Sequence, residues 1–183
     1  MSKPDWCRSA WTAVRTLRRA AGLLVLALLA APLAARAQEP AAVLGAGLFG
    51  LDGNEDQAAV LNGEYRWAPF KVTGVLKFHP LVGVLGTTHS TFHLRAGFGR
   101  DFPFAQRWNV NINSAAGYYH TGNGKELGSD VEFRSAIELS CRLASHHRVG
   151  IALAHLSNAG IGEHNPGIES LELTFAWLEP FSH

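Results

Sequence analysis

Three residues near the end of the chain have the types that hydrolyse esters by nucleophilic attack. His155 and Ser157 are two positions apart, and Glu169 follows after a short connection. A serine hydroxyl is a weak nucleophile until a neighbouring imidazole takes its proton, and the imidazole works best when a carboxylate orients it. These residues are the candidate triad, with Ser157 as nucleophile, His155 as base and Glu169 as the acidic member.

Two segments in which apolar and polar residues alternate must position the candidate triad. Residues two apart on a strand point to the same face, so His155 and Ser157 continue the apolar track of segment 148–158. Glu169 heads a second apolar track in segment 168–178. If the two segments pair as a hairpin, the three side chains meet on one face. The apolar residues beside them, which would contact a lipid chain, are Ile151, Leu153, Leu171 and Leu173.

The turn after Ser157 holds candidate donors to an oxyanion. The side chain of Asn158, or the backbone amides at Ala159 and Gly160, would stabilise the charge of a tetrahedral intermediate. On spacing alone an alternative stays open, in which His155 and Ser157 lie at an aqueous rim and Glu169 is an exposed loop residue.

The first 37 residues have the layout of a secretory signal peptide. Three arginines between positions 15 and 19 precede an apolar run, residues 20–35, that ends in the small-x-small pattern Ala35-Arg36-Ala37. A spanning helix needs about 20 apolar residues, and this run is shorter and contains Pro32. We therefore expect residues 1–37 to be removed, leaving 38–183 as one exported domain.

The exported part alternates between apolar and polar residues in eight segments of strand length. In segment 129–143 the charged residues Glu132, Arg134, Glu138 and Arg142 oppose a nearly pure apolar face. A soluble sandwich or a soluble barrel with an apolar interior would alternate in the same way. The eight segments are 41–51, 57–67, 70–79, 88–99, 107–120, 129–143, 148–158 and 168–178.

The expected export of the chain and the positions of its aromatic residues favour a membrane barrel over the soluble sandwich and the soluble barrel. Aromatic side chains gather near segment ends, as in the interface girdles of outer-membrane barrels, and strands of about 9–11 residues match a tilted membrane crossing. The predicted fold is all-β, an eight-stranded antiparallel transmembrane β-barrel. The aromatic residues are Trp67, Phe70, Phe102, Phe104, Trp108, Tyr118, Tyr119, Trp177 and Phe181.

Composition excludes several other classes of function. After position 37 the chain has 10 basic and 14 acidic residues and no basic run, so nucleic acid is not an expected partner. One of the two cysteines, Cys7, lies in the expected leader, which leaves Cys141 without a disulfide partner. His89 and His93 lie about 13 Å apart if both are on one strand, too far for a metal pair. Neither a metal nor a cofactor is expected.

The run His155-Leu156-Ser157-Asn158-Ala159-Gly160-Ile161, with Asn165-Pro166-Gly167-Ile168-Glu169-Ser170, resembles the signature of the lipid A 3-O-deacylase family of outer-membrane acyl hydrolases. The resemblance implies an eight-stranded barrel with Ser157, His155 and Glu169 as catalytic triad on its outer wall and Asn158 in oxyanion stabilisation. It also implies removal of the ester-linked 3-hydroxyacyl chain at position 3 of lipid A. The chain departs from many outer-membrane barrels in ending Phe181-Ser182-His183, without a terminal aromatic residue.

Topology places the triad within the membrane. An even number of strands with both ends in the periplasm puts the connection between the last two segments on the extracellular side. The expected partner is therefore lipid A of lipopolysaccharide in the outer leaflet, and a second copy of the chain is left open as a partner. The rival functions are a non-catalytic small barrel, a soluble carrier, and a phospholipase with the same triad.

Overall fold

The structure is a computed structural model that describes residues 39–51, 57–73, 76–144 and 146–179. The expected leader, residues 1–37, lies outside the described residues, so its removal remains a prediction. Across these described ranges, no helix has the length and apolar character needed to cross a membrane.

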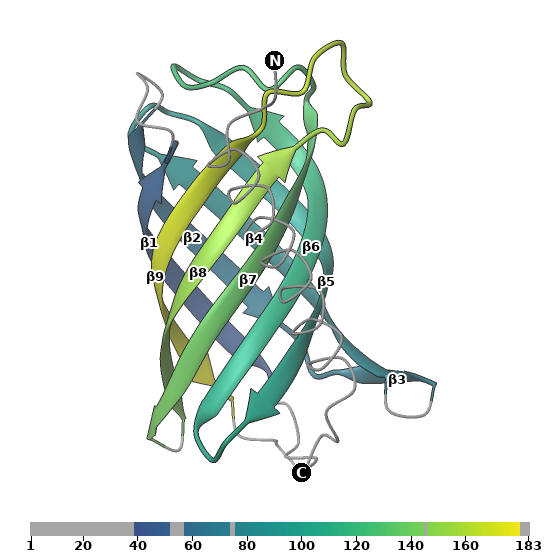
Figure 1. The fold of residues 1–183 in the computed structure, drawn as a ribbon, viewed down its shortest axis with the longest axis vertical. Helices are drawn as coiled ribbons and strands as arrows, with labels where there is room; N and C mark the ends of the chain where they lie inside the picture. The colour runs from purple at the N-terminus through teal and green to yellow at the C-terminus, as the bar shows by residue number, and fades with distance from the viewer. Residues whose placement is uncertain (1–38, 52–56, 74–75, 145, 180–183) are drawn as a thin grey trace, which may run out of the picture. The chain divides into compact units, whose positions relative to one another are not determined.

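The described residues form a closed antiparallel barrel (Figure 1). Neighbouring strands pair in sequence, and the cylinder closes through pairing of β1 with β9 and of β2 with β4, while β3 pairs with β4 alone. The predicted eight-stranded barrel is thereby confirmed, with β3 as an additional strand outside the cylinder. The strands are β1 (Ala41–Phe49), β2 (Ala58–Arg66), β3 (Phe70–Thr73), β4 (Leu76–Thr87), β5 (Phe92–Phe104), β6 (Trp108–His120), β7 (Val131–Ala144), β8 (His147–Ser157) and β9 (Ile168–Leu178).

Two predicted strand boundaries were wrong, and Pro80 explains the first. Segment 70–79 was expected to cross the membrane, but residues 70–73 form a short hairpin with the start of β4, and the crossing strand continues through Pro80 to Thr87. Proline within an apolar run usually marks a strand end, because it has no N–H to donate. Here it lies where β4 leaves β3 and begins to pair with β2. Segment 88–99 is likewise displaced, because β5 spans Phe92–Phe104.

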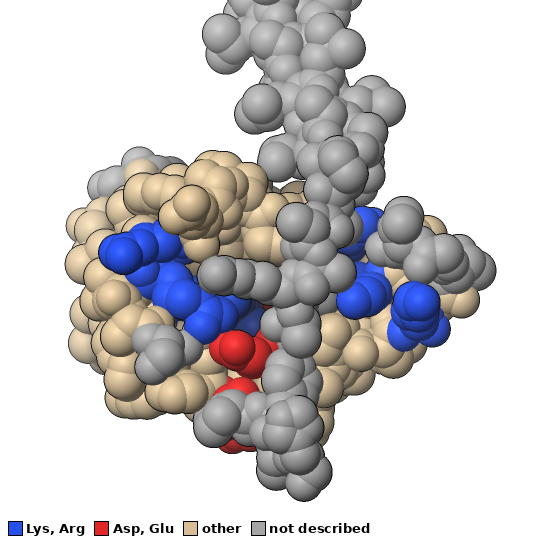
Figure 2. All heavy atoms as spheres, turned by 90° about the horizontal axis from the view of Figure 1, so that it is seen from below, with Lys and Arg blue, Asp and Glu red and all other residues tan. Residues whose placement is uncertain are grey.

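The barrel has its apolar side chains outside and its charged side chains inside. On β7, Ile137 and Leu139 are 46% exposed, whereas Glu132, Arg134 and Glu138 are at most 2% exposed. Seen from below, acidic side chains and a group of basic ones gather around the middle of the lower end, further basic ones lie at the right of the view, and the rest of the visible described surface is uncharged (Figure 2). This inversion of a soluble barrel suits hydrocarbon, because a closed barrel satisfies every strand amide and turns a mostly apolar face toward lipid.

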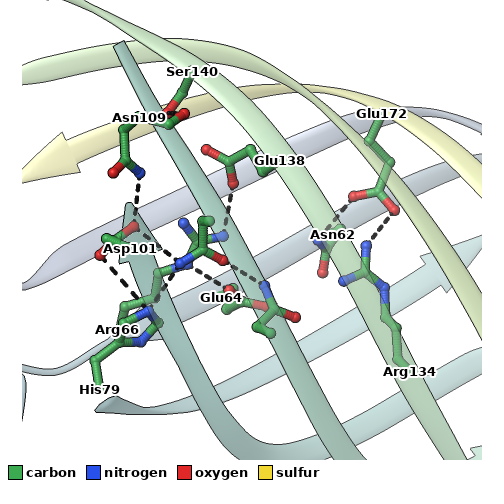
Figure 3. A network of polar contacts seen from close by, with 12 residues as sticks. Asn62, Glu64, Arg66, His79, Asp101, Asn109, Arg134, Glu138, Ser140 and Glu172 are labelled. Carbon is green, nitrogen blue, oxygen red and sulfur yellow. Dashed lines mark hydrogen bonds and ion pairs between the residues drawn. The ribbon is translucent and has the colours of Figure 1, made fainter. Parts of the chain in front are cut away.

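Ion pairs and amide hydrogen bonds fill the lower lumen (Figure 3). Arg66 bonds to Glu64 and to Glu138, each at 2.7 Å. Arg95 donates to the other carboxylate oxygen of Glu64 at 2.9 Å and to the side-chain oxygen of Asn62 at 2.8 Å. Each buried charge in this group therefore has an oppositely charged partner, which buried charges require.

Glu172 of β9 is the centre of a second group. Its carboxylate accepts from Arg134 at 2.8 Å, from Asn62 at 2.9 Å and from Ser170 at 2.8 Å. Gly45 of β1 makes room for it, since a Cβ added there would lie 2.7 Å from Glu172 Oε2. Small inward residues and large charged ones thus complement each other in a narrow lumen.

An apolar cluster closes the other end of the lumen, beneath the loops. Leu127, in the connection between β6 and β7, is fully buried against inward residues of the strands. The connections at this end, such as 121–130 and 158–167, are long, whereas 105–107 and 145–146 at the other end are short. Outer-membrane barrels have long extracellular loops and short periplasmic turns, so we expect the end that carries 158–167 to be the extracellular one. The other cluster members are Phe49, Val60, Leu85, Tyr119, Leu156 and Ile168.

We expect Glu172→Ala to destabilise the barrel by about 3–5 kcal/mol, because it leaves the buried guanidinium of Arg134 without its ion-pair partner. The midpoint of urea unfolding of the detergent-solubilised barrel measures this loss. Glu163→Ala removes an exposed loop carboxylate and is the matched control, with an expected change within about 0.5 kcal/mol. Equal midpoints for the two variants would contradict the structural role of the lumen network.

Candidate active site on the outer wall

The β8–β9 hairpin brings a histidine and a glutamate into contact on the outer surface. His155 and Glu169 are direct cross-strand partners, and His155 Nδ1 lies 3.0 Å from Glu169 Oε1. The two side chains are 51% and 48% exposed. The pair therefore lies on the wall of the barrel, separate from the lumen network.

The contact with Glu169 fixes which imidazole nitrogen is basic. An ionised carboxylate only accepts hydrogen bonds, so Nδ1 carries a hydrogen and donates a hydrogen bond to Glu169. Nε2 is then the nitrogen with a free lone pair, as a general base requires. This arrangement matches the role of the acidic residue in a serine hydrolase triad, which holds the tautomer and stabilises the imidazolium.

Gly167 lies beneath the free side of the imidazole. A Cβ added to Gly167 would lie 2.6 Å from His155 Cε1 and 3.2 Å from Nε2, and its φ of 62° favours glycine. Leu156 pairs with Ile168, so the register continued by one residue places Gly167 beside Ser157. Only glycine, which has no side chain, therefore leaves room at position 167 for the imidazole ring.

Ser157 ends β8 on the same outward face as His155. It is partly exposed and pairs with Phe133 of β7. Within the described ranges its hydroxyl forms no recorded hydrogen bond, and the structure does not bring Nε2 and the hydroxyl into contact. Such contacts are often long without substrate and tighten only when it binds.

Asn158 and Gly160 are placed differently from the sequence expectation. The Asn158 side chain is fully buried and points inward, where its amide donates to the carbonyls of Leu127 at 2.8 Å and His164 at 2.7 Å. The Gly160 amide donates to Asn158 Oδ1 at 2.8 Å. Both expected oxyanion donors therefore bind the loops together in this conformation. Alternation explains the difference, since Asn158 follows an outward Ser157 and must face the lumen.

The four expected lipid-contacting residues lie outside, beside the candidate triad. Ile151, Leu153, Leu171 and Leu173 are all between 44% and 69% exposed and form two adjacent tracks on β8 and β9. Only Leu153 also lines the hollow described next.

A groove of about 700 Å³ begins at His155 and Glu169 of the candidate triad and crosses the outer wall toward β5. His155, Glu169 and Leu153 line its beginning, and Phe98 and Phe78 line its far part. Between them lie Ser135 of β7 and Ser114 of β6, with Ile137 and Ile112 beside them. We call this hollow the outer-wall groove.

Sequence reasoning missed three residues of this site. Gly167 lies in the connection before the last predicted segment, and its spacing to Glu169 gives no sign that the imidazole ring lies above it. Ser114 and Ser135 each interrupt an apolar track, which is a signal that alternation alone provides but whose meaning depends on neighbouring strands. Among the described residues no group of three or more histidine, cysteine or acidic side chains is arranged to hold a metal ion.

Comparison with known proteins gives a consistent family match. A sequence model of the family described as Lipid A 3-O-deacylase (PagL) matches residues 85–177. The chain is 40% identical over 53 residues to Lipid A deacylase PagL of Bordetella bronchiseptica (strain ATCC BAA-588 / NCTC 13252 / RB50). That alignment covers 29% of this chain and 30% of the relative, so it spans less than a third of the relative's length.

Solved structures share the barrel architecture. The crystal structure of the outer membrane enzyme PagL superposes with a TM-score of 0.55 at 20% identity, covering 77% of this chain and 99% of that one. A de novo designed transmembrane β-barrel gives a TM-score of 0.53 at 10% identity, covering 78% of this chain and 97% of the design. A designed barrel matches almost as well as the enzyme, so these superpositions establish the fold and not the activity.

Proposed function

This chain belongs to the lipid A 3-O-deacylase (PagL) family, and we propose that it is an outer-membrane serine esterase that removes the ester-linked 3-hydroxyacyl chain at position 3 of lipid A. The observation that carries the proposal is the 3.0 Å contact between His155 Nδ1 and Glu169 Oε1 on the lipid-facing wall. Ionisable groups on a lipid-facing wall lose solvation, at a free-energy cost that is largest at the bilayer centre and falls toward the interface. Their convergence beside Ser157 supports a catalytic role.

The reaction proceeds through an acyl-enzyme. His155 Nε2 takes the proton of Ser157 as the hydroxyl oxygen attacks the ester carbonyl, and Glu169 stabilises the resulting imidazolium. The tetrahedral intermediate collapses, the sugar oxygen leaves with the proton returned by Nε2, and the acyl group stays on Ser157. A water molecule, deprotonated by the same nitrogen, then releases the 3-hydroxy fatty acid.

Backbone amides of the turn after Ser157 supply the oxyanion donors in this proposal. The Gly160 amide and the Asn158 side chain already have acceptors. Ala159, with a φ of 56°, has an amide for which no acceptor is recorded within the described chain. Asn158 then acts as a positioning residue, because its hydrogen bonds hold the turn that presents this amide.

Lipid A reaches this site by lateral diffusion in the outer leaflet. The site lies at the extracellular end of β8, where the sugar and the acyl chains of lipid A meet. Ile151, Leu153, Leu171 and Leu173 provide an exposed apolar surface against which its remaining chains pack. These contacts are van der Waals contacts, because the chains are already in hydrocarbon.

Mass spectrometry of lipid A tests the proposal against its rivals. Purified protein is incubated in detergent micelles with lipid A and, separately, with phospholipid vesicles. We expect lipid A to lose one 3-hydroxyacyl group and phospholipids to stay intact. Unchanged lipid A would favour a non-catalytic barrel, and release of fatty acid from the vesicles would favour the phospholipase.

We expect Gly167→Ala to lower kcat about 100-fold, because the new Cβ displaces the imidazole from its place over residue 167, and misplacement of a catalytic group by about 1 Å costs that much. The rate of lipid A deacylation in micelles measures the effect, and heat-dependent gel mobility checks that the barrel is folded. Gly86→Ala is the matched control, since a Cβ there meets nothing within 4 Å. Equal rates for both variants would show that the position of the ring does not limit turnover.

A further inference from the structure

A single cross-strand row runs from the candidate triad along the outer-wall groove. His155 pairs with Ser135 on β7, Ser135 with Ser114 on β6, and Ser114 with Phe98 on β5. All four side chains face outward. The row therefore follows the floor of the groove away from the nucleophile, across three strand spacings of about 4.8 Å each.

The two serines, which we call the serine pair, are unusual for a lipid-facing surface. They bond to each other, with 3.1 Å between their hydroxyl oxygens, while the next outward residues on the same strands, Ile112 and Ile137, are apolar. Two hydroxyls that share one hydrogen bond retain one further O–H donor and free lone pairs. An apolar neighbourhood makes an unused hydroxyl costly, so the serine pair is matched to a ligand that brings one polar group into the groove.

The position of the serine pair selects that polar group. Ser135 is directly opposite His155 and therefore diagonal to Ser157, at about 7–8 Å between backbone positions. A hydroxyl on the third carbon of an acyl chain is separated by one methylene from the carbonyl that Ser157 attacks. Its oxygen thus falls within hydrogen-bond reach of Ser135 when the chain enters the groove.

We propose that the serine pair binds the 3-hydroxyl of the scissile chain and makes the enzyme selective for 3-hydroxyacyl esters over unsubstituted ones. This inference rests on the proposed function. The remaining hydrocarbon lies past Ile137 and Ile112 toward Phe98. Ser135 is a specificity residue and takes no part in proton transfer.

Two synthetic glucosamine esters of equal chain length, one 3-hydroxylated and one unsubstituted, test this proposal in detergent micelles. We expect Ser135→Ala to lower kcat/KM for the 3-hydroxyacyl ester about tenfold, the usual worth of one hydrogen bond in an apolar site, and to leave the unsubstituted ester unchanged. Ser135→Thr keeps the hydroxyl and should retain most of the selectivity.

The outcomes separate the two proposals. If wild-type protein cleaves neither ester, the proposed esterase function fails. If it cleaves esters but Ser135→Ala leaves the ratio of the two kcat/KM values unchanged, or lowers both values equally, then the serine pair has a structural role and the inference is overturned.

Discussion

Ser157→Ala is expected to leave lipid A fully acylated, with turnover lowered by about 10⁶-fold, the scale of losing the nucleophile from a serine hydrolase triad. The reason is chemical, since alanine has no oxygen with which to form the acyl-enzyme. The rate of 3-hydroxy fatty acid release from lipid A in micelles measures the loss.

Ser140→Ala is the matched control for this variant. Ser140 is buried in the lumen, on the opposite side of the barrel wall from the candidate triad, so the same atom is removed without contact with substrate. Its rate should stay near that of the wild type. Residual activity of Ser157→Ala within tenfold of the control would mean that another group is the nucleophile.

Glu169→Gln has the second largest expected effect, a decrease in kcat of about 10³–10⁴-fold. Glutamine keeps the shape of the side chain, but its neutral amide neither stabilises an imidazolium nor enforces the tautomer in which Nε2 is basic. KM should change little, because glutamine keeps the size and shape of the Glu169 side chain at the beginning of the groove. Steady-state kinetics on lipid A separate the two parameters.

Exposed Glu163, in the connection that precedes β9, offers the same substitution away from the pair formed by His155 and Glu169. Glu163→Gln should keep wild-type kinetics. Full activity in Glu169→Gln would show that a different group orients the imidazole, and would leave the 3.0 Å contact without a catalytic role.

Most of the barrel was predictable because its strands obey strict alternation. β7 and β8 alternate clearly apart from the polar residues of the candidate site and the groove, and their bounds lie within two residues of the predicted segments. The third and fourth segments were not predictable, because Pro80 reads as a strand end when its change of partner from β3 to β2 is unknown. The local pattern does not contain the identity of the neighbouring strand.

The same limit applies to the candidate site. The shared outward face of His155 and Ser157 follows from their spacing, and the contact with Glu169 follows from hairpin register. The position of Gly167 under the ring and the proximity of Ser114 to Ser135 depend on three-dimensional neighbours that spacing does not encode. The inward direction of Asn158 follows from alternation, but its hydrogen bonds to the loop carbonyls depend on residues that are distant in sequence.

The outer-wall groove has a floor and sides that belong to the protein, but its open side faces the bilayer. Surrounding lipids therefore cover the side of a bound acyl chain that the protein leaves open. Tighter packing of those lipids would press a bound chain against the floor and hinder its exit, so turnover becomes a property of the leaflet's physical state as well as of the polypeptide. The same enzyme molecule would then run at different speeds in ordered and in fluid membranes.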